Sequence, residues 1–203
     1  PIGLMAIIFS PFVGKTIAKV DPRKYASFAF MVFGAVLWMR SRFSTDADMA
    51  TLMVPTIIQG VGMAFFFIPL VTLTLSGIPP ERTAGASGLS NFMRITAGAM
   101  GTSISTTLWE NRASVHHAHM SEAITQGRAA SEQAFAGLGS LGMSPQQSLA
   151  FVNRLVDQQA FMLAADDVFF LSSMIFLALI PCVWITRRMG AAQGAGDSAA
   201  GAH

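Results

Sequence analysis

The longest charge-free stretch of the chain, residues 49–80, reads MATLMVPTIIQGVGMAFFFIPLVTLTLSGIPP. A helix that crosses a membrane needs about 20 mostly apolar residues, because the hydrocarbon core of a bilayer is about 30 Å thick. This stretch exceeds that length without a single Asp, Glu, Lys or Arg. It therefore predicts a membrane-spanning helix.

The composition of the whole chain points to the same class. Of the 203 residues, 52% are hydrophobic and 12% are charged, and the mean hydropathy is +0.52. Average soluble chains carry about 25% charged residues, so this chain has too little polar surface to cover a water-soluble domain. Its high hydrophobicity and its net charge of +2 also exclude general disorder, which requires the opposite combination.

Apolar runs on both sides of this stretch predict an all-α integral membrane bundle. We expect five spanning helices, at residues 1–18, 24–43, 51–78, 83–109 and 167–186. The segments between and after them are expected to be an extracytoplasmic loop over 110–166 and a flexible Gly- and Ala-rich tail over 187–203. Because Pro1 lies inside an apolar run without a signal-peptide pattern, we expect a fragment whose first helix is cut short at its beginning.

The distribution of Lys and Arg predicts the orientation, since short cytoplasmic connections carry an excess of them. On the side expected to be cytoplasmic lie Lys15, Lys19, Arg23, Lys24, Arg82, Arg187 and Arg188. The opposite side carries a short acidic turn with Asp46 and Asp48. Arg40, Arg42 and Arg112 also fall on that side and reduce the difference in positive charge between the two sides. We therefore place the C-terminus in the cytoplasm. Basic residues at the ends of apolar runs orient helices, so nucleic-acid binding is not expected.

The segment over 110–166 is too polar to span a membrane and too long for a bare turn. Ser144-Pro145-Gln146-Gln147 offers an N-cap, a Pro at the first helical position and a Gln at the third. Apolar residues then recur at helical spacing, at Leu149, Val152, Val156, Ala160 and Leu163. We expect an amphipathic helix that packs on its own bundle or docks a periplasmic partner.

The predicted fourth helix carries polar residues where lipid is expected. Asn91 and Arg94 are three apart and share a helix face. Arg94 is either a structural or snorkelling charge, or a residue that lines a substrate or proton route. On the same face Gly98 and Gly101 predict close helix packing, because small residues let helices approach.

The predicted third helix places Gln59, Phe66 and Pro69 near one stripe. Pro69 lacks an N–H group and should bend the helix. A buried Gln beside aromatic rings suits a site for amphipathic, partly aromatic molecules. Each Phe is equally compatible with a lipid-facing or core position, so Gln59 is the stronger candidate.

Enzymatic patterns are weak in this sequence. His116, His117 and His119 form a His cluster, but the further ligands of a closed metal site do not accompany it. Phosphate-binding loops and nucleophile elbows are absent. We therefore expect neither an enzyme nor a metal or other cofactor. A His-cluster membrane enzyme and a non-transporting scaffold or channel remain as alternatives.

Two sets of motifs resemble a known family. The connection with Gly14, Asp21, Arg23 and Lys24 resembles a degenerate second copy of the cytoplasmic-loop motif of the major facilitator superfamily. Further motifs are similar to those of the EmrB-type multidrug exporters, the 14-helix branch of drug:proton antiporters. They are Gln59-Gly60, Phe66-Phe67-Ile68-Pro69-Leu70, Ser90-Asn91-Phe92-Met93-Arg94 and Gly101-Thr102-Ser103.

This resemblance covers nearly the whole chain and implies most of a C-terminal half, with helices similar to the tenth to fourteenth of the family. It implies that Gln59, Asn91 and Arg94 face a central cavity for hydrophobic or amphipathic substrates. The resemblance also implies that the proton-coupling acid lies in the missing N-terminal half, and the predicted membrane core here has no Asp or Glu to replace it. The resemblance also implies the bacterial inner membrane, and a periplasmic adaptor and an outer-membrane channel as partners. A superfamily transporter of another solute, such as a siderophore or lipid, is the alternative.

Overall fold

The described residues form helices and their short connections, with no strand. The computed structural model describes residues 2–16, 20–45, 47–75, 78–126 and 128–185. Its helices are α1 (Ile2–Thr16), α2 (Pro22–Arg40), α3 (Met49–Leu75), α4 (Thr83–Gln126), α5 (Arg128–Ser140) and α6 (Pro145–Ile185), with a 3-10 turn, η1 (Pro80–Arg82), before α4. The expected tail over 187–203 and the expected helix end at Ser76-Gly77 lie outside the described residues.

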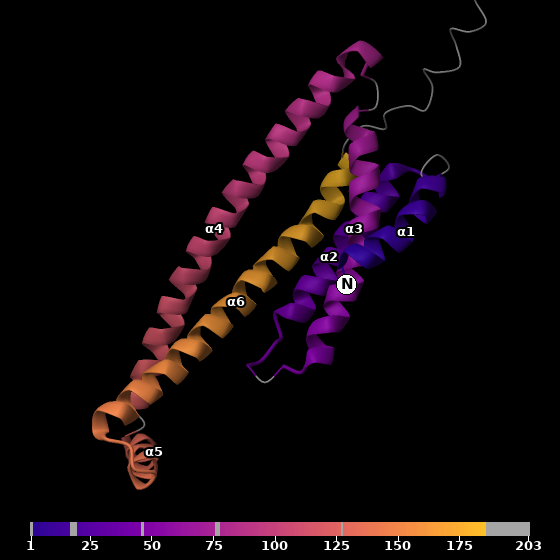
Figure 1. Ribbon diagram of the computed structural model, residues 1–203. Coiled ribbons are helices and arrows are strands. Elements are labelled where there is room, and N and C mark those ends of the chain that lie inside the picture. Colours follow the sequence, from indigo (N-terminus) through magenta and orange to yellow (C-terminus); the bar gives the residue numbers. More distant parts are fainter. Residues whose placement is uncertain (1, 17–19, 46, 76–77, 127, 186–203) are drawn as a thin grey trace, which may run out of the picture.

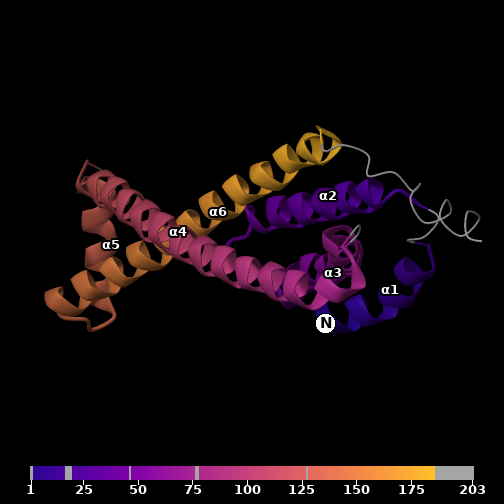
Figure 2. The ribbon, with the colours of Figure 1, turned by 90° about the horizontal axis from the view of Figure 1, so that it is seen from above.

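The helices form a compact group and a long hairpin (Figure 1). In the group, α3 lies between α1 and α2, and α2 also packs against α6. In the hairpin, α4 and α6 run in opposite directions, approach each other near α5 and diverge towards the start of α4. Seen from above, α4 crosses over α6 (Figure 2).

Small residues set the two tightest helix contacts within the group. A Cβ added at Gly60 on α3 would lie 2.6 Å from the carbonyl oxygen of Ile2 on α1, so these helices approach too closely for a side chain. On α6 the buried Ser173 donates its hydroxyl to the carbonyl oxygen of Gly34 on α2 at 2.7 Å. These contacts join α1 to α3, and α2 to the second half of α6.

The segment over 110–166, predicted as an extracytoplasmic loop with an amphipathic helix, is mostly helical in the structure. Helix α4 continues past Trp109 to Gln126, and α6 runs without a break from Pro145 to Ile185. The reason is that no Gly or Pro lies between Thr102 and Gln126, or between Pro145 and Pro181. The sequence changes polarity near residues 110 and 166, but no residue there interrupts the helical hydrogen bonds.

The start of α6 confirms the predicted capping box. The hydroxyl of Ser144 accepts from the backbone N–H of Gln147 at 3.3 Å, and the Gln147 side chain accepts from the N–H of Ser144 at 2.8 Å. The preceding turn uses Gly142, whose φ of 86° favours glycine. The amphipathic helix expected here is therefore the first part of α6.

Two described helices are long and apolar enough to cross a membrane, α3 over Met49–Val71 and α6. Helix α1 is apolar but shorter. The division of the other helices into membrane-spanning and extracytoplasmic parts stays a prediction.

Candidate substrate pathway

The polar face predicted on α4 is present in the structure. The Nη2 of Arg94 donates to the Oδ1 of Asn91 at 2.7 Å, which confirms that the two side chains share a face. Both residues are exposed, as is every residue from Asn91 to Thr107. The pair is therefore a charged and hydrogen-bonding feature on an uncovered stretch of helix.

The packing expected at Gly98 and Gly101 is not made within the described chain. An added Cβ at either glycine would meet nothing within 4 Å. The cause is the divergence of α4 from α6 along this stretch (Figure 1). Large apolar residues of the same stretch are also exposed, among them Leu89, Phe92, Met100 and Ile104. Close packing at these glycines stays a prediction for contacts beyond this chain.

Gln59 is joined to a cation that the sequence analysis treated only as a topology signal. The Nη2 of Arg40, in the last turn of α2, donates to the Oε1 of Gln59 at 2.7 Å and reaches the hydroxyl of Thr56 at 3.5 Å. All three side chains are half-buried. Arg40 ends one apolar run and Gln59 is a polar residue within the next apolar run. That combination is the sequence signal that could have identified the pair.

Phe66 lies in an aromatic cluster between three helices. Its ring centroid is 5.9 Å from that of Phe30 and 5.7 Å from that of Phe33, both on α2. Phe176 of α6 packs on the same two α2 rings. Phe66 therefore contributes to the packing of α2, α3 and α6, and Pro69 is buried within the continuous helix α3.

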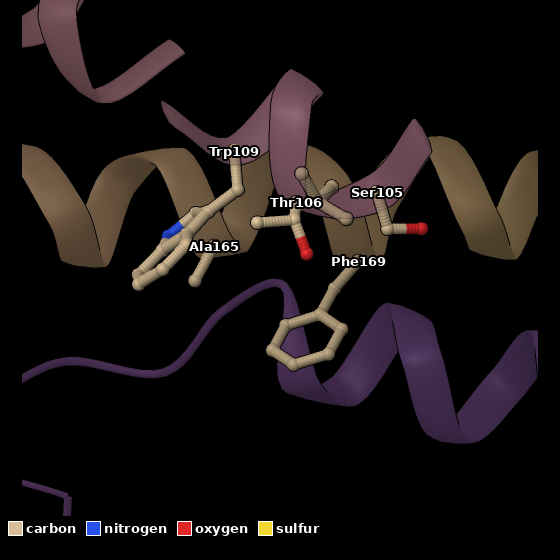
Figure 3. Close-up of a pocket in the computed structure, with 6 residues that line it drawn as sticks. Ser105, Thr106, Trp109, Ala165 and Phe169 are labelled. Carbon is tan, nitrogen blue, oxygen red and sulfur yellow. The ribbon is translucent and has the colours of Figure 1, made fainter. Parts of the chain in front are cut away.

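A cavity of about 300 Å³ opens between α4 and α6. Its lining residues are Ser105, Thr106 and Trp109 of α4, and Ala165, Val168 and Phe169 of α6 (Figure 3). The Trp109 indole donates to the carbonyl oxygen of Phe161 at 3.0 Å, which fixes the ring that walls the cavity. An apolar cavity with two hydroxyl groups is at the lower end of the size range of small-molecule sites.

Polar bridges continue along the hairpin beyond this cavity. The Oδ2 of Asp167 lies 2.9 Å from the Nε2 of His116 and 3.8 Å from the Nε of Arg112. The Nε2 of His117 lies 3.3 Å from the Oδ1 of Asp157. Two residues of the His cluster thus tie α4 to α6, and no group that could hold a metal ion occurs among the described residues.

Asp166 faces a different environment from its neighbour. Its Oδ1 is buried and has no hydrogen-bond partner among the described residues. Burial raises the pKa of the Asp166 carboxyl above its ordinary value, and the nearby charge of Asp167 raises it further. The sequence analysis did not single out this residue, because nothing in its spacing distinguishes it from Asp167.

The motif at the first connection forms the start of α2. The side chain of Asp21 accepts from the backbone N–H of Arg23 at 3.0 Å, and Pro22 takes the first helical position. The N–H of Lys24 donates to the carbonyl oxygen of Asp21 at 2.9 Å. Gly14 lies in the last turn of α1 with open space around it. These residues fix the turn from α1 into α2.

The predicted pathway residues fall into separate places. Gln59 is bound by Arg40 between α2 and α3, whereas Asn91 and Arg94 pair on α4. No hydrogen bond or ring contact described here joins the two pairs. Sequence reasoning missed Arg40 as the partner of Gln59 and Trp109 as a wall of the cavity.

Comparisons with known proteins identify the relatives of this chain. No family model and no solved structure matches it. It is 38% identical over 204 residues to the multidrug export protein EmrB of Escherichia coli strain K12, a match that covers 100% of this chain and 39% of that protein. It is 36% identical over 187 residues to the fatty acid resistance protein FarB of Neisseria gonorrhoeae, covering 92% and 37%.

A third relative, the multidrug export protein EmrB of Haemophilus influenzae, is 34% identical over 188 residues, covering 92% of this chain and 37% of that protein. The chain thus spans about two fifths of the length of these relatives. The matched region is their C-terminal part. The chain is therefore EmrB-like over its whole length and corresponds to the C-terminal part of proteins of this type.

Proposed function

We propose that this chain is the C-terminal part of a proton-driven efflux transporter that exports hydrophobic or amphipathic compounds by alternating access. The observation that carries this proposal is the similarity of the whole chain to proteins named for multidrug export. In such transporters two halves rock around a central site near the membrane midplane. This chain would supply part of one half.

The uncovered face of α4 supports this assignment. A guanidinium group exposed to hydrocarbon is costly, so an arginine within a spanning helix faces protein or a water-filled cavity. The face with Asn91, Arg94, Gly98 and Gly101 is open in this chain. We propose that the N-terminal half of the transporter lies opposite this face and that the substrate passage runs between them.

The proposed setting is the bacterial inner membrane, with the C-terminus and the connection around Asp21 in the cytoplasm. The α4–α6 hairpin with α5 would then project on the opposite side. There it would offer a long helical surface to a periplasmic adaptor and, through it, to an outer-membrane channel. Proton coupling would depend on an acid in the N-terminal half.

A second candidate substrate class follows from one relative. The protein named for fatty acid resistance matches 92% of this chain. Export of fatty acids is therefore the alternative to export of a broad set of drugs. Both candidates share an apolar body with a polar head group.

The proposal is tested by replacing Arg94 with Gln in the complete protein, expressed in drug-sensitive cells. Loss of a hydrogen bond that involves a charged group removes about 1.5–3 kcal/mol, so we expect export to fall about tenfold or more. Arg82→Gln, an exposed change in η1, is the matched control and should keep export. Wild-type protein that exports none of the tested compounds would contradict the proposed function. Unchanged export by R94Q at equal membrane abundance would remove Arg94 from the mechanism.

A further inference from the structure

The contact between Arg40 and Gln59 has a chemical consequence for the groups around it. A guanidinium group has N–H donors and no acceptor, so the amide of Gln59 can meet it only through its carbonyl oxygen. The 2.7 Å contact joins these two groups. The amide nitrogen of Gln59, with its two N–H donors, must therefore point away from Arg40.

The Arg40 side chain contacts α3 away from the first turn of that helix. Arg40 is the last residue of α2, next to the short connection to α3. Gln59 lies about 15 Å along α3 from Met49, at a rise of about 1.5 Å per residue. The contact with Arg40 thus lies on the side of α3 and not at its start.

No described ion pair joins Arg40 to an acid, and on α6, which also packs against α2, Asp157 and Asp167 pair with residues of α4. Neither α1, α2 nor α3 contains an Asp or Glu. The partners that the structure gives Arg40 are the neutral side chains of Gln59 and Thr56. Arg40 and Gln59 are half-buried, so part of each remains accessible. The pair presents positive charge and N–H donors together.

We propose that Arg40 is a specificity-determining positioning residue of the transport pathway. By holding the carbonyl oxygen of Gln59, it turns the amide donors outward, and this end of the pathway then selects amphipathic molecules whose head group is an acceptor, above all a carboxylate. The inference rests on the proposed function, because it assigns the head-group preference of the same pathway. Molecules with a cationic head group meet the charge of Arg40 and no acceptor from Gln59.

The test compares two probes with the same alkyl chain, dodecanoate and dodecyltrimethylammonium, in energised inside-out vesicles that contain the complete protein. Wild-type protein should transport dodecanoate with the lower KM. Arg40→Gln should raise the KM for dodecanoate about tenfold, as expected for the loss of one charged hydrogen bond, with little change in the maximal rate. It should leave the KM for dodecyltrimethylammonium unchanged or lower it.

Three further variants separate selection from folding. Arg42→Gln removes a nearby charge that lies over the Trp38 ring at 4.3 Å, and it should keep the wild-type KM ratio of the two probes. Arg40→Lys should restore part of that ratio, because Lys keeps the charge and some donors. Gln59→Ala should lower the ratio, and R40Q added to it should have a smaller effect than R40Q alone.

The outcomes are distinct. A KM ratio that changes in R40Q and Q59A but not in R42Q supports the inference. If R40Q does not accumulate in the membrane, the KM ratio of the two probes is measured in Arg40→Lys and Gln59→Ala instead. An unchanged KM ratio in both variants overturns the inference. Equal loss of both probes in R40Q would also overturn it, because Arg40 would then be structural. Wild-type transport without head-group preference overturns the inference alone, whereas no transport of either probe contradicts the proposed function as well.

Discussion

The indole N–H of Trp109 on α4 donates to the backbone carbonyl oxygen of Phe161 on α6 at 3.0 Å, while the two rings pack with centroids 5.1 Å apart. One side chain thus provides a polar and an aromatic contact at the point where the two long helices meet. Trp109 also forms a wall of the α4–α6 cavity. This contact joins α4 to α6 in the hairpin.

Replacing Trp109 separates its two contacts. Trp109→Phe keeps a ring and loses the hydrogen bond, which should cost about 1 kcal/mol. Trp109→Ala loses both the hydrogen bond and the ring contact and should cost about 2 kcal/mol, less than a core residue because Trp109 is 37% exposed. Hydrogen exchange of the amides between residues 105 and 120 measures the effect in the complete protein. Equal exchange in both variants and the wild type would show that the hairpin is fastened elsewhere.

The capping box of α6 gives a second prediction. Ser144→Ala removes the hydroxyl that accepts from the Gln147 N–H, and loss of such a cap costs about 0.5–2 kcal/mol. We expect faster hydrogen exchange over the first turns of α6, with the segment after Asp167 unaffected. Ser140→Ala, at the end of α5, is the matched control, because its hydroxyl bonds only the local carbonyl of Gly137. Equal effects of the two changes would contradict the capping role.

The raised pKa of Asp166 predicts a pH effect. The folded protein holds this proton to a higher pH than the unfolded chain, so stability contributed by the protonated form is lost as pH rises through the folded-state pKa. Asp166→Asn cannot lose that contribution. We expect the variant to have a higher Tm than wild type at pH 7.5, by on the order of 1 °C, and little difference at pH 4.

Asp157→Asn serves as the control for this pH effect. Asp157 lies on the same helix and is paired with His117 at 3.3 Å, so its replacement should not stabilise the protein at pH 7.5. Purified protein in detergent, followed by thermal unfolding across this pH range, supplies the measurement. A lower Tm for Asp166→Asn at pH 7.5 would show that the carboxylate form is the stabilising one.

The sequence was sufficient for the helices but not for their ends. Apolar runs and charge predicted the helical class, and Ser144 with Gln147 marked the start of α6. Helix α4 continues past the predicted boundary at Trp109, because a helix that leaves an apolar environment need not stop where Gly and Pro are absent. The polarity of a segment indicates which solvent surrounds it, whereas Gly and Pro indicate where a helix ends.

The site was predictable where residues are close in sequence. The three-residue spacing of Asn91 and Arg94 is enough to place them on one face. Arg40 and Gln59 are separated by a helix end and a turn, and their contact depends on how far α3 slides along α2. The position of α3 along α2 is set by side-chain packing, for example between the rings of Phe33 and Phe66. Hydrophobic periodicity within one helix does not predict it.

The most direct test of the central claim is the solvent around the Arg94 face of α4 in the membrane. Cys182, which is exposed, and any cysteine in the rest of the complete protein are first replaced with Ser. Single cysteines are then placed at Asn91 and Gly98 on the polar face, and at Met100 and Ile104 off it, in the complete protein. A membrane-impermeant maleimide is applied from each side.

We predict that cysteines at 91 and 98 react with the maleimide and are protected by a transported compound, whereas cysteines at 100 and 104 stay unlabelled. This pattern would place Arg94 beside an aqueous passage. Labelling at 100 and 104 with none at 91 and 98 would put the guanidinium side of α4 in lipid, and would contradict the proposed pathway.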